Sequence, residues 1–426
     1  MKKLIALLCA FAVCVSLASC GKESKKDESV KEVNAETTEK ESNVLTVKAA
    51  MLKGDHLYFV VENNFDKPVK GFDYAYASYD SDGEVIGDSY THTCSDAVNI
   101  APGKKQCVEG YVFDSDSVYV DIMITSVTFG EDDTWELKNR YEKTPKNTFD
   151  IDAYKKNVSA LANEVTDLQD NPYLDIATSF VYDDSAYFVV ENISGKTIID
   201  FEIIYRKYDA NGLSIDNGYS RQKISSANML AGEKDAVSAW ESSTAYVKGV
   251  ISSITFDSGE KWSNPDAEIW AITRGNFSVE EYNAEIAAMA EEAKKAETAP
   301  YLTIVSTEKY NDNSYSSSDD FDFEIKNISG KTISKADFMV LEYDANGYAI
   351  STSSYNNYCK NSRTVSGTVN LSPDEQSGFT SDLFFSAECE QYKCIVSAVT
   401  FDDGTEWKNP YLYEWILINS PKYIAS

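Results

Sequence analysis

The chain has 426 residues, of which 43% are hydrophobic and 12% aromatic, so its length suits about two to four domains with apolar cores. Its 69 acidic residues outnumber its 39 basic residues and give a formal net charge of −30. Such a surface repels nucleic acid, whose binding depends on Lys and Arg, and it opposes direct binding to anionic lipid headgroups.

The first twenty residues have the pattern of a secretory signal. Two lysines precede an apolar run over residues 4–15, and small residues lead up to Cys20. The segment closely resembles the lipobox of bacterial lipoproteins, which implies cleavage before Cys20 and diacylglyceryl attachment to it. We therefore expect residues 1–19 to be a lipoprotein signal peptide, and the protein to be lipid-anchored at the cell membrane, facing outside the cytoplasm. A plain secretory signal is the nearer alternative, since a membrane span needs roughly 20 apolar residues.

Residues 20–43 are predicted to be a disordered tether that starts at the lipidated Cys20. They are rich in Lys, Glu, Ser and Thr, and they contain no aromatic residue. Such a segment cannot bury enough apolar surface to offset the entropy lost on ordering. The expected role of the tether is to lift the folded part off the membrane.

From about residue 44 the chain repeats itself three times. Asn63, Asn192 and Asn327 each follow an alternating apolar run, with steps of 192 − 63 = 129 and 327 − 192 = 135 residues. Other landmarks keep the same order: Tyr79, Tyr208 and Tyr343 before an Asp, then Trp135, Trp262 and Trp407 after a Thr-Phe pair. Chance does not readily give so many matched landmarks in one order.

Each unit is predicted to consist of strands. In the second unit, apolar residues alternate over 187–191 and again over 201–205, on either side of a Ser-Gly turn. The strand that contains 201–205 ends at Asn211-Gly212. Asn-Gly and Asp-Gly pairs favour tight hairpins. Several short strands with regular turns in roughly 100 residues are typical of an antiparallel sandwich of immunoglobulin type.

Two amphipathic helices are predicted between the units, at about residues 152–169 and 279–296 within linkers 149–170 and 277–298. Their apolar stripes are Tyr154, Val158, Leu161, Val165 and Leu168, and Val279, Tyr282, Ile286, Met289 and Ala293. Ser278 and Glu281 form a capping box at the start of the second helix. We expect each helix to be a semi-rigid spacer packed against its neighbours; a coiled-coil partner is the alternative, for which about two heptads are short.

The predicted fold is therefore mostly β: three tandem antiparallel immunoglobulin-like β-sandwiches joined by two α-helical linkers. The predicted boundaries are 44–148 for the first sandwich, 149–170 for the first linker, 171–276 for the second sandwich, 277–298 for the second linker and 299–426 for the third sandwich. The third unit is predicted to end without a linker helix.

The units are similar to the FxLYD-type and related immunoglobulin-like domains of bacterial lipoproteins. Three stretches carry the resemblance: the Asn-Ile-Ser-Gly-Lys-Thr-Ile turn at 192–198 and 327–333, the Tyr-Asp-x-Asn-Gly hairpin at 208–212 and 343–347, and the Thr-Phe-Asp-x-Gly-x-x-Trp stretch at 255–262 and 400–407. The resemblance implies an extracytoplasmic binding or spacer module and brings no active site with it.

Five cysteines remain beyond Cys20: Cys94, Cys107, Cys359, Cys389 and Cys394. Disulfides are allowed outside the cytoplasm, so Cys94 could bridge to Cys107, and Cys359 to Cys389 or Cys394 with one thiol left over. An anaerobic host would keep all five reduced. The cysteine spacing does not match a zinc site.

Two kinds of acidic sequence have oxygen ligands that could suit calcium. Asp80, Asp209 and Asp344 begin stretches that resemble the start of an EF-hand loop, but the twelfth positions, Thr91, Ser220 and Tyr355, are not Glu, so hairpin turns explain them better. The acidic residues within 311–322 give a weak calcium site as an alternative to a solvated loop. We expect no metal or other cofactor.

The sequence offers no catalytic constellation, because its two His residues lack a nucleophile motif and no glycine-rich phosphate loop is present. We therefore expect a non-enzymatic lipoprotein that acts as a multi-domain binding or spacer module for an unknown protein. The alternative is a carbohydrate-binding lipoprotein that feeds a transport or degradation system. Trp270 and Trp415, each eight residues after another Trp, are its candidate glycan-contact aromatics, although such tryptophans more often lie in a core. A hydrolase is the third reading.

Overall fold

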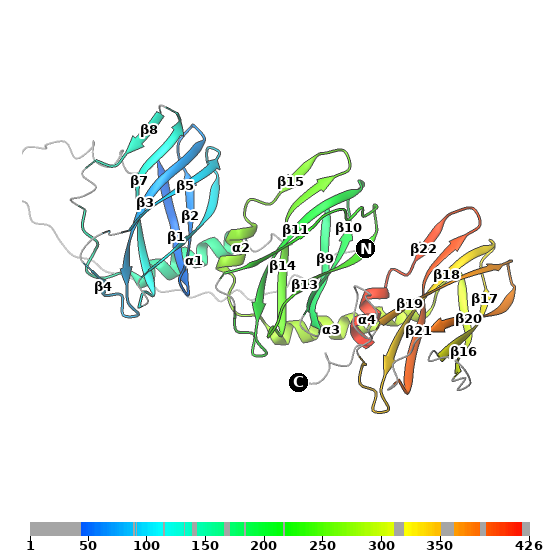
Figure 1. The fold of residues 1–426 in the computed structure, drawn as a ribbon. Coiled ribbons are helices and arrows are strands. Elements are labelled where there is room, and N and C mark those ends of the chain that lie inside the picture. Colours follow the sequence, from blue (N-terminus) through cyan, green and yellow to red (C-terminus); the bar gives the residue numbers. More distant parts are fainter. Residues whose placement is uncertain are drawn as a thin grey trace, which may run out of the picture. The chain divides into compact units, whose positions relative to one another are not determined.

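The computed structural model describes residues 44–87, 90, 92–113, 116–131, 133–138, 143–165, 171–182, 185–215, 218–310, 319–350, 362–383 and 389–419 (Figure 1). The signal peptide predicted over 1–19, the tether predicted over 20–43 and the lipidation site Cys20 lie outside these residues. Within them the chain is mostly β, with several antiparallel sheets.

The described strands form three pairs of sheets, which we call module 1 (44–136), module 2 (171–263) and module 3 (301–408). Module 1 contains the sheets β1(Leu45–Lys53)–β2(His56–Asn63)–β6(Lys105–Tyr111) and β4(Val85–Ile86)–β3(Val69–Tyr79)–β7(Tyr119–Gly130)–β8(Asp133–Glu136), with β5(His92–Ile100) also paired to β3.

Modules 2 and 3 repeat this strand order. Module 2 contains β13(Lys234–Trp240)–β10(Ser185–Asn192)–β9(Leu174–Tyr182) and β12(Ser220–Ile224)–β11(Ile198–Tyr208)–β14(Tyr246–Phe256)–β15(Lys261–Ser263). Module 3 contains β16(Leu302–Tyr310)–β17(Asp319–Asn327)–β20(Gln376–Leu383) and β19(Ser362–Leu371)–β18(Ile333–Tyr343)–β21(Gln391–Phe401)–β22(Glu406–Lys408). The threefold repeat seen in the sequence is therefore also a repeat of topology.

Both sheets of a module contribute to one apolar core. Successive strand residues point to opposite faces, so alternate residues of each strand reach the core. Phe59, Phe188 and Phe323 occupy equivalent core positions and are 0%, 0% and 1% exposed. Burial of one such side chain contributes about 1.5–3 kcal/mol.

The repeated asparagines close a turn in every module. Asn63, Asn192 and Asn327 are each 0% exposed, and each side chain bonds only backbone and turn groups of its own module. The amide Nδ2 donates to at least two carbonyls, and Oδ1 accepts from a backbone N–H two residues on. The carbonyl acceptors are Lys67 and Ile100, Lys196 and Met229, and Lys331 and Leu371, all at 2.8–2.9 Å. A buried amide satisfied in this way fixes the turn without a polar cost.

Helices α1(Ile151–Glu164) and α3(Val279–Ala293) begin on matching aromatic clusters. Two tyrosines of the preceding module and one of the helix surround a Phe just before the helix. In module 1 these are Tyr79, Tyr119, Phe149 and Tyr154; in module 2 they are Tyr208, Tyr246, Phe277 and Tyr282. The Phe stacks on the second Tyr with ring centroids 5.1 Å and 4.8 Å apart. Asp150 and Ser278 cap the two helices through their side chains.

Three further helical segments were not predicted as separate elements. The helix α2(Ala267–Thr273) follows β15, and α4(Leu412–Asn419) follows β22 at the equivalent place, so modules 2 and 3 share a short helix that was not expected. A 3-10 turn over Lys294–Glu297 extends α3. Among the described helices, none combines the length and the apolar character that crossing a membrane requires.

Candidate functional site at the module junctions

Residues far apart in the chain meet between modules 1 and 2, in a buried apolar cluster that we call junction 1–2. Its members come from module 1, α1, module 2 and α2: Ala49, Met51, Tyr58, Val60, Cys107, Leu161, Val165, Ile204, Val250, Ala267, Ile269, Trp270, Ala271 and Ile272. Strand alternation explains how module 1 supplies this face. Leu57 and Phe59 point into the module's own core, whereas Tyr58 and Val60 point outward into the junction.

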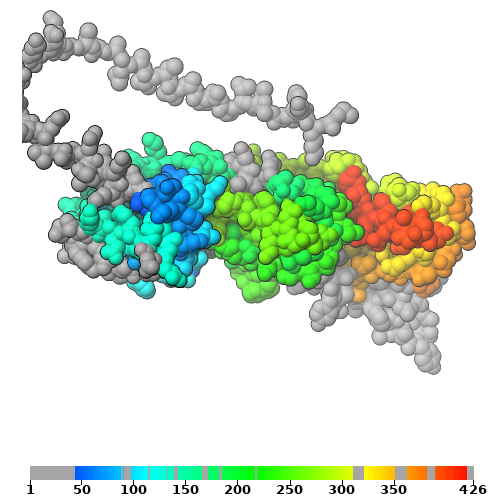
Figure 2. All heavy atoms as spheres, turned by 90° about the horizontal axis from the view of Figure 1, so that it is seen from above, coloured from blue at the N-terminus to red at the C-terminus, as the bar shows by residue number. Residues whose placement is uncertain are grey.

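A second cluster, junction 2–3, has the same construction. Its members are Phe180, Tyr187, Val189, Ala236, Ala293, Ala296, Met339, Leu341, Tyr343, Ile395, Trp415, Ile416 and Leu417. Figure 2 shows α4 in red where the green surface of module 2 meets the yellow and orange surface of module 3. The outer face of the three-stranded sheet of module 2 thus packs against module 3. The same face of module 1 packs against module 2 in the same way.

Many apolar positions of the two junctions correspond. The strand registers place the following pairs at equivalent sites: Met51 and Phe180, Tyr58 and Tyr187, Val60 and Val189, Cys107 and Ala236, Ile204 and Met339, Val250 and Ile395, Trp270 and Trp415. Each pair keeps an apolar side chain, so the repeat unit includes its junction.

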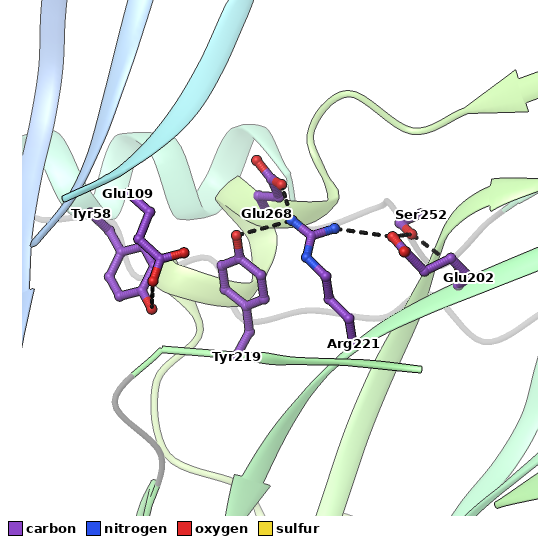
Figure 3. Close-up of polar contacts among 7 residues, drawn as sticks. All are labelled: Tyr58, Glu109, Glu202, Tyr219, Arg221, Ser252 and Glu268. Carbon is purple, nitrogen blue, oxygen red and sulfur yellow. Dashed lines mark hydrogen bonds and ion pairs between the residues drawn. The ribbon is translucent and has the colours of Figure 1, made fainter. Parts of the chain in front are cut away.

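The rim of junction 1–2 is a polar network centred on Arg221 of β12 (Figure 3). Its guanidinium bonds Glu202 at 3.0 Å and Tyr219 at 3.2 Å, and it also pairs with Glu268 of α2. Ser252 donates to Glu202 at 2.7 Å. These residues all belong to module 2 and its helix α2, so this network orders the module 2 side of the junction.

Aromatic side chains connect the two sides of this rim. The ring of Tyr58, from module 1, lies 5.7 Å from the ring of Tyr219 and contacts Glu109 through its hydroxyl at 3.5 Å (Figure 3). Burial raises the pKa of Tyr219, and the nearby carboxylate of Glu268 raises it further, so its hydroxyl stays protonated at neutral pH. Gly218 makes room for Tyr58: a Cβ at Gly218, whose φ is +149°, would lie 2.1 Å from the Tyr58 hydroxyl.

A cleft of about 380 Å³ opens beside Arg221 between the two modules. Lys104 and Lys105 line it from module 1, and Glu202 and Glu268 line it from module 2. Both of these carboxylates already pair with Arg221, and Lys105 pairs with Glu164 of α1. The charges that line the cleft are therefore largely compensated within the protein, which is typical of a structural rim.

The rim of junction 2–3 instead has polar contacts that cross from module 2 to the next module. Lys234 of β13 bonds Glu414 of α4 at 2.6 Å, and Tyr413 of α4 bonds Asp235 at 3.2 Å. Lys408 of β22 pairs with Glu233. Burial raises the pKa of the Asp235 carboxyl, although its hydrogen bonds oppose the shift.

The predicted glycan-contact tryptophans are not at the surface. Trp270 and Trp415 are each 1% exposed and lie in the two junctions. The prediction that they stack on sugar is therefore corrected: each lies on a short helix whose apolar face is covered by the neighbouring module. Exposed aromatics lie elsewhere, at Tyr111 (52% exposed) and Trp240 (77% exposed).

The described cysteines carry free thiols. Cys107 faces junction 1–2, and Cys389 and Cys394 lie in module 3 without a bridge. The pairings predicted for these three residues are thus not formed; the Cys94 side chain and Cys359 fall outside what the structure describes. Burial raises the pKa of Cys107 and Cys394, and raises that of Cys389 to about 11, so none of the three is a ready thiolate.

The three Asp-led sequences form hairpin turns. The Oδ1 atom of Asp80, Asp209 and Asp344 accepts from two backbone N–H groups of its own turn at 2.8–2.9 Å. Among the described residues, no group of three or more His, Cys, Asp and Glu side chains could hold a metal ion. The acidic residues 311–318 lie outside the described part.

Comparison with known proteins adds a partial family match. The family described as a family of unknown function (DUF5780) matches residues 321–420, which lie in module 3 and α4. No curated protein matches the sequence.

Two solved structures show weak similarity to the chain. The 1.85 Å crystal structure of a hypothetical protein from Peptoclostridium difficile 630 is 16% identical, covers 28% of this chain and 92% of its own, and has a TM-score of 0.23. A chain titled pT26-6p is 9% identical over 88% of this chain and 65% of its own, with a TM-score of 0.14. Both TM-scores are too low to assign a fold.

Proposed function

We propose that this protein is a non-enzymatic lipoprotein of the extracytoplasmic membrane surface, in which three modules act as a spacer that carries a binding surface. Residues 20–43 serve as the tether, and Cys20 carries the lipid. The observation that supports the spacer role is the repeated junction: two apolar clusters, built from equivalent positions, join successive modules. Two acyl chains at about 0.8 kcal/mol per buried methylene hold the chain at a membrane.

In this proposal each module is an immunoglobulin-like sandwich, and α1 and α3 are linkers. The support is that each helix starts on an aromatic cluster of one module and ends in the junction with the next. In α1, Tyr154 belongs to the aromatic cluster and Leu161 to junction 1–2; in α3, Tyr282 belongs to the aromatic cluster and Ala293 to junction 2–3. A linker packed at both ends resists bending more than a flexible loop does.

Metabolic labelling with a palmitate analogue tests the anchor. The full chain takes up label and fractionates with membranes, whereas Cys20→Ser abolishes the label and releases the protein into the soluble extracytoplasmic fraction. Label that persists in Cys20→Ser contradicts the anchor. Cys9→Ser, inside the predicted signal peptide, is the matched control and leaves labelling intact.

A carbohydrate-binding role is the second candidate, and one observation favours it. Tyr111 and Trp240 lie at the same position of modules 1 and 2, at the end of the third strand of the smaller sheet, and both are exposed. Exposed aromatic faces stack on sugar rings. A glycan array with the full chain, repeated with Tyr111→Ala and Trp240→Ala, tests it: binding lost in both variants supports the role, and binding to no glycan removes it.

A further inference from the structure

Module 2 carries a cleft that shares only Val250 with the junction clusters. It lies between α3 and the strands β9 and β14, in two adjoining spaces of about 320 and 340 Å³ that share Lys248, Phe277, Tyr282 and Glu285. Arg274, directly after α2, lines the second space together with Lys248. Spaces of this size suit a small ligand.

The two cations of this cleft lack carboxylate partners. Lys248 and Arg274 are half-buried, and neither side chain makes a hydrogen bond or ion pair with any residue that the structure describes. The guanidinium of Arg274 lies over the ring of Trp270, 5.4 Å from its centroid. By contrast, Arg221 and Arg363 each pair with a carboxylate. In a chain with 69 acidic residues, two adjacent cations without a contacting carboxylate are unusual.

In modules 1 and 3 the residue equivalent to Lys248 makes a hydrogen bond within the protein. The residue equivalent to Lys248 is Asp121 in module 1, which accepts a hydrogen bond from Tyr90 at 2.6 Å. In module 3 it is Lys393, which donates to Asn419 at the end of α4. Arg274 stands where module 3 has Asn419, four residues after the junction Trp. Module 2 alone therefore places a second cation where module 3 has a neutral hydrogen-bond partner.

The surrounding charges favour a bound anion of single charge. Burial lowers the pKa of Lys248, and the charge of Arg274 lowers it further, while Glu285 and Glu281 of α3 raise it. Tyr282 and Asp175 also line the cleft. Both glutamates are exposed, so water screens them. An anion relieves the repulsion between the two cations, but Glu281 and Glu285 disfavour a dianion such as phosphate.

We propose that this cleft binds the carboxylate group of a small ligand through Nζ of Lys248 and the guanidinium of Arg274. The planar guanidinium matches the two carboxylate oxygens, and the ammonium adds a point charge. The rings of Phe277 and Tyr282 supply an apolar wall beside them. This site depends neither on the lipid anchor nor on the spacer role.

Isothermal titration calorimetry of the full chain with glucuronate, a carboxylate probe, tests the proposal. We expect saturable binding, no binding of neutral glucose, and weaker binding of inorganic phosphate. Arg274→Asn, which installs the module 3 residue, and Lys248→Gln each lower the affinity by about tenfold or more, since each removes one charge-assisted hydrogen bond. Lys393→Gln, at the equivalent position of module 3, is the matched control and leaves binding unchanged.

A second readout separates binding by Lys248 from an indirect effect. The free cleft lowers the pKa of Lys248, so binding of an anion should raise this pKa again. At alkaline pH the protein then takes up protons as the anion binds. Titrations in two buffers of different ionisation enthalpy measure this proton uptake. Circular dichroism confirms that the variants fold. No saturable glucuronate binding, equal binding by Arg274→Asn, or tighter binding of phosphate overturns the proposal.

Discussion

In junction 1–2 the ion pairs described at the rim join Arg221 to Glu202 and Glu268 on the module 2 side and Lys105 of module 1 to Glu164 of α1, whereas those of junction 2–3 cross between modules 2 and 3. Lys234 reaches from module 2 to Glu414, and Lys408 reaches from module 3 to Glu233. Beneath these rims the apolar clusters use equivalent positions.

This difference indicates that the apolar clusters join the modules, whereas the polar rims make the two junctions different from each other. Apolar burial at about 25 cal/mol per Å² needs only suitable volume at each site, so copies of a repeat retain it while side chains drift. Surface ion pairs contribute about 0–1 kcal/mol each, so the rims can diverge at little cost. The rims are therefore where the two junctions differ in response to pH, salt and mutation.

The largest expected effect is the loss of a junction tryptophan. Trp270→Ala and Trp415→Ala each leave a cavity where a 1% exposed indole stood, and each should lower the free energy of unfolding by about 3–5 kcal/mol. Urea denaturation followed by circular dichroism measures the loss. A loss below about 1 kcal/mol in either variant would show that the helix does not pack as described.

The indole nitrogens refine this comparison. Trp415 Nε1 donates to Glu297 at 3.3 Å, whereas Trp270 Nε1 is buried with no acceptor among the residues that the structure describes. Trp415→Phe should therefore cost about 1 kcal/mol more than Trp270→Phe in the same assay. Equal costs would mean that the bond to Glu297 is not stabilising.

A glycine tests the close contact of junction 1–2. Gly218→Ala places a Cβ 2.1 Å from the Tyr58 hydroxyl at a backbone φ of +149°, which should cost about 1–3 kcal/mol. The matched control is Gly195→Ala, because a Cβ at Gly195 meets nothing within 4 Å. Thermal unfolding of both variants measures the difference; an unchanged midpoint for Gly218→Ala would show that Tyr58 moves away freely.

The equivalent lysines Lys105 and Lys234 compare the rims directly. Lys234→Met leaves Glu414, which is 8% exposed, without its cation, and should cost about 1–2 kcal/mol. Lys105→Met leaves only the exposed Glu164 and should cost less than about 1 kcal/mol. Urea titrations give both values. A larger loss for Lys105→Met would reverse the assignment of the crossing ion pairs to junction 2–3.

The sequence predicted those features that depend on local pattern. The repeated asparagines, the Asp-led turns and the alternating strands follow from periodicity and turn chemistry, which act over a few residues. The short helices were missed because residues 267–272 are apolar apart from Glu268, and residues 415–417 are all apolar. A helix covered all round shows no amphipathic period, so it cannot be told from a buried strand.

The junctions could have been found by comparing the repeats position by position. Outward-facing residues such as Tyr58, Val60, Tyr187 and Val189 are apolar where one sheet face should be polar. At the corresponding positions module 3 has Asp322 and Glu324. The apolar outer faces of the first two modules signal a covering neighbour. The partners of Arg221 and Lys234 could not be predicted, because they depend on contacts between separate modules.

The smallest expected effect concerns Asp235, whose counterpart in junction 1–2 is the neutral Gln106. Burial raises the pKa of Asp235, so the folded state holds its proton more tightly than the unfolded state does. Protonation of Asp235 therefore stabilises the folded state. This contribution to the free energy of unfolding is fully present below the ordinary Asp pKa of about 3.9, and it is lost as pH rises through the raised pKa of the folded state. Asp235→Asn, which keeps an acceptor for Tyr413, should therefore be more stable than the wild type at pH 7, by less than about 1 kcal/mol.

Unfolding free energies measured between pH 3 and pH 8 test this, since the advantage of Asp235→Asn should shrink toward acid pH. Gln106→Ala in junction 1–2 should show no such pH dependence relative to wild type, because an amide does not titrate. An advantage of Asp235→Asn that grows as pH falls would mean that the hydrogen bonds from Tyr413 and from the backbone N–H of Ala236 outweigh burial. The carboxylate would then stabilise junction 2–3, and the polar contacts of its rim would contribute to joining the modules.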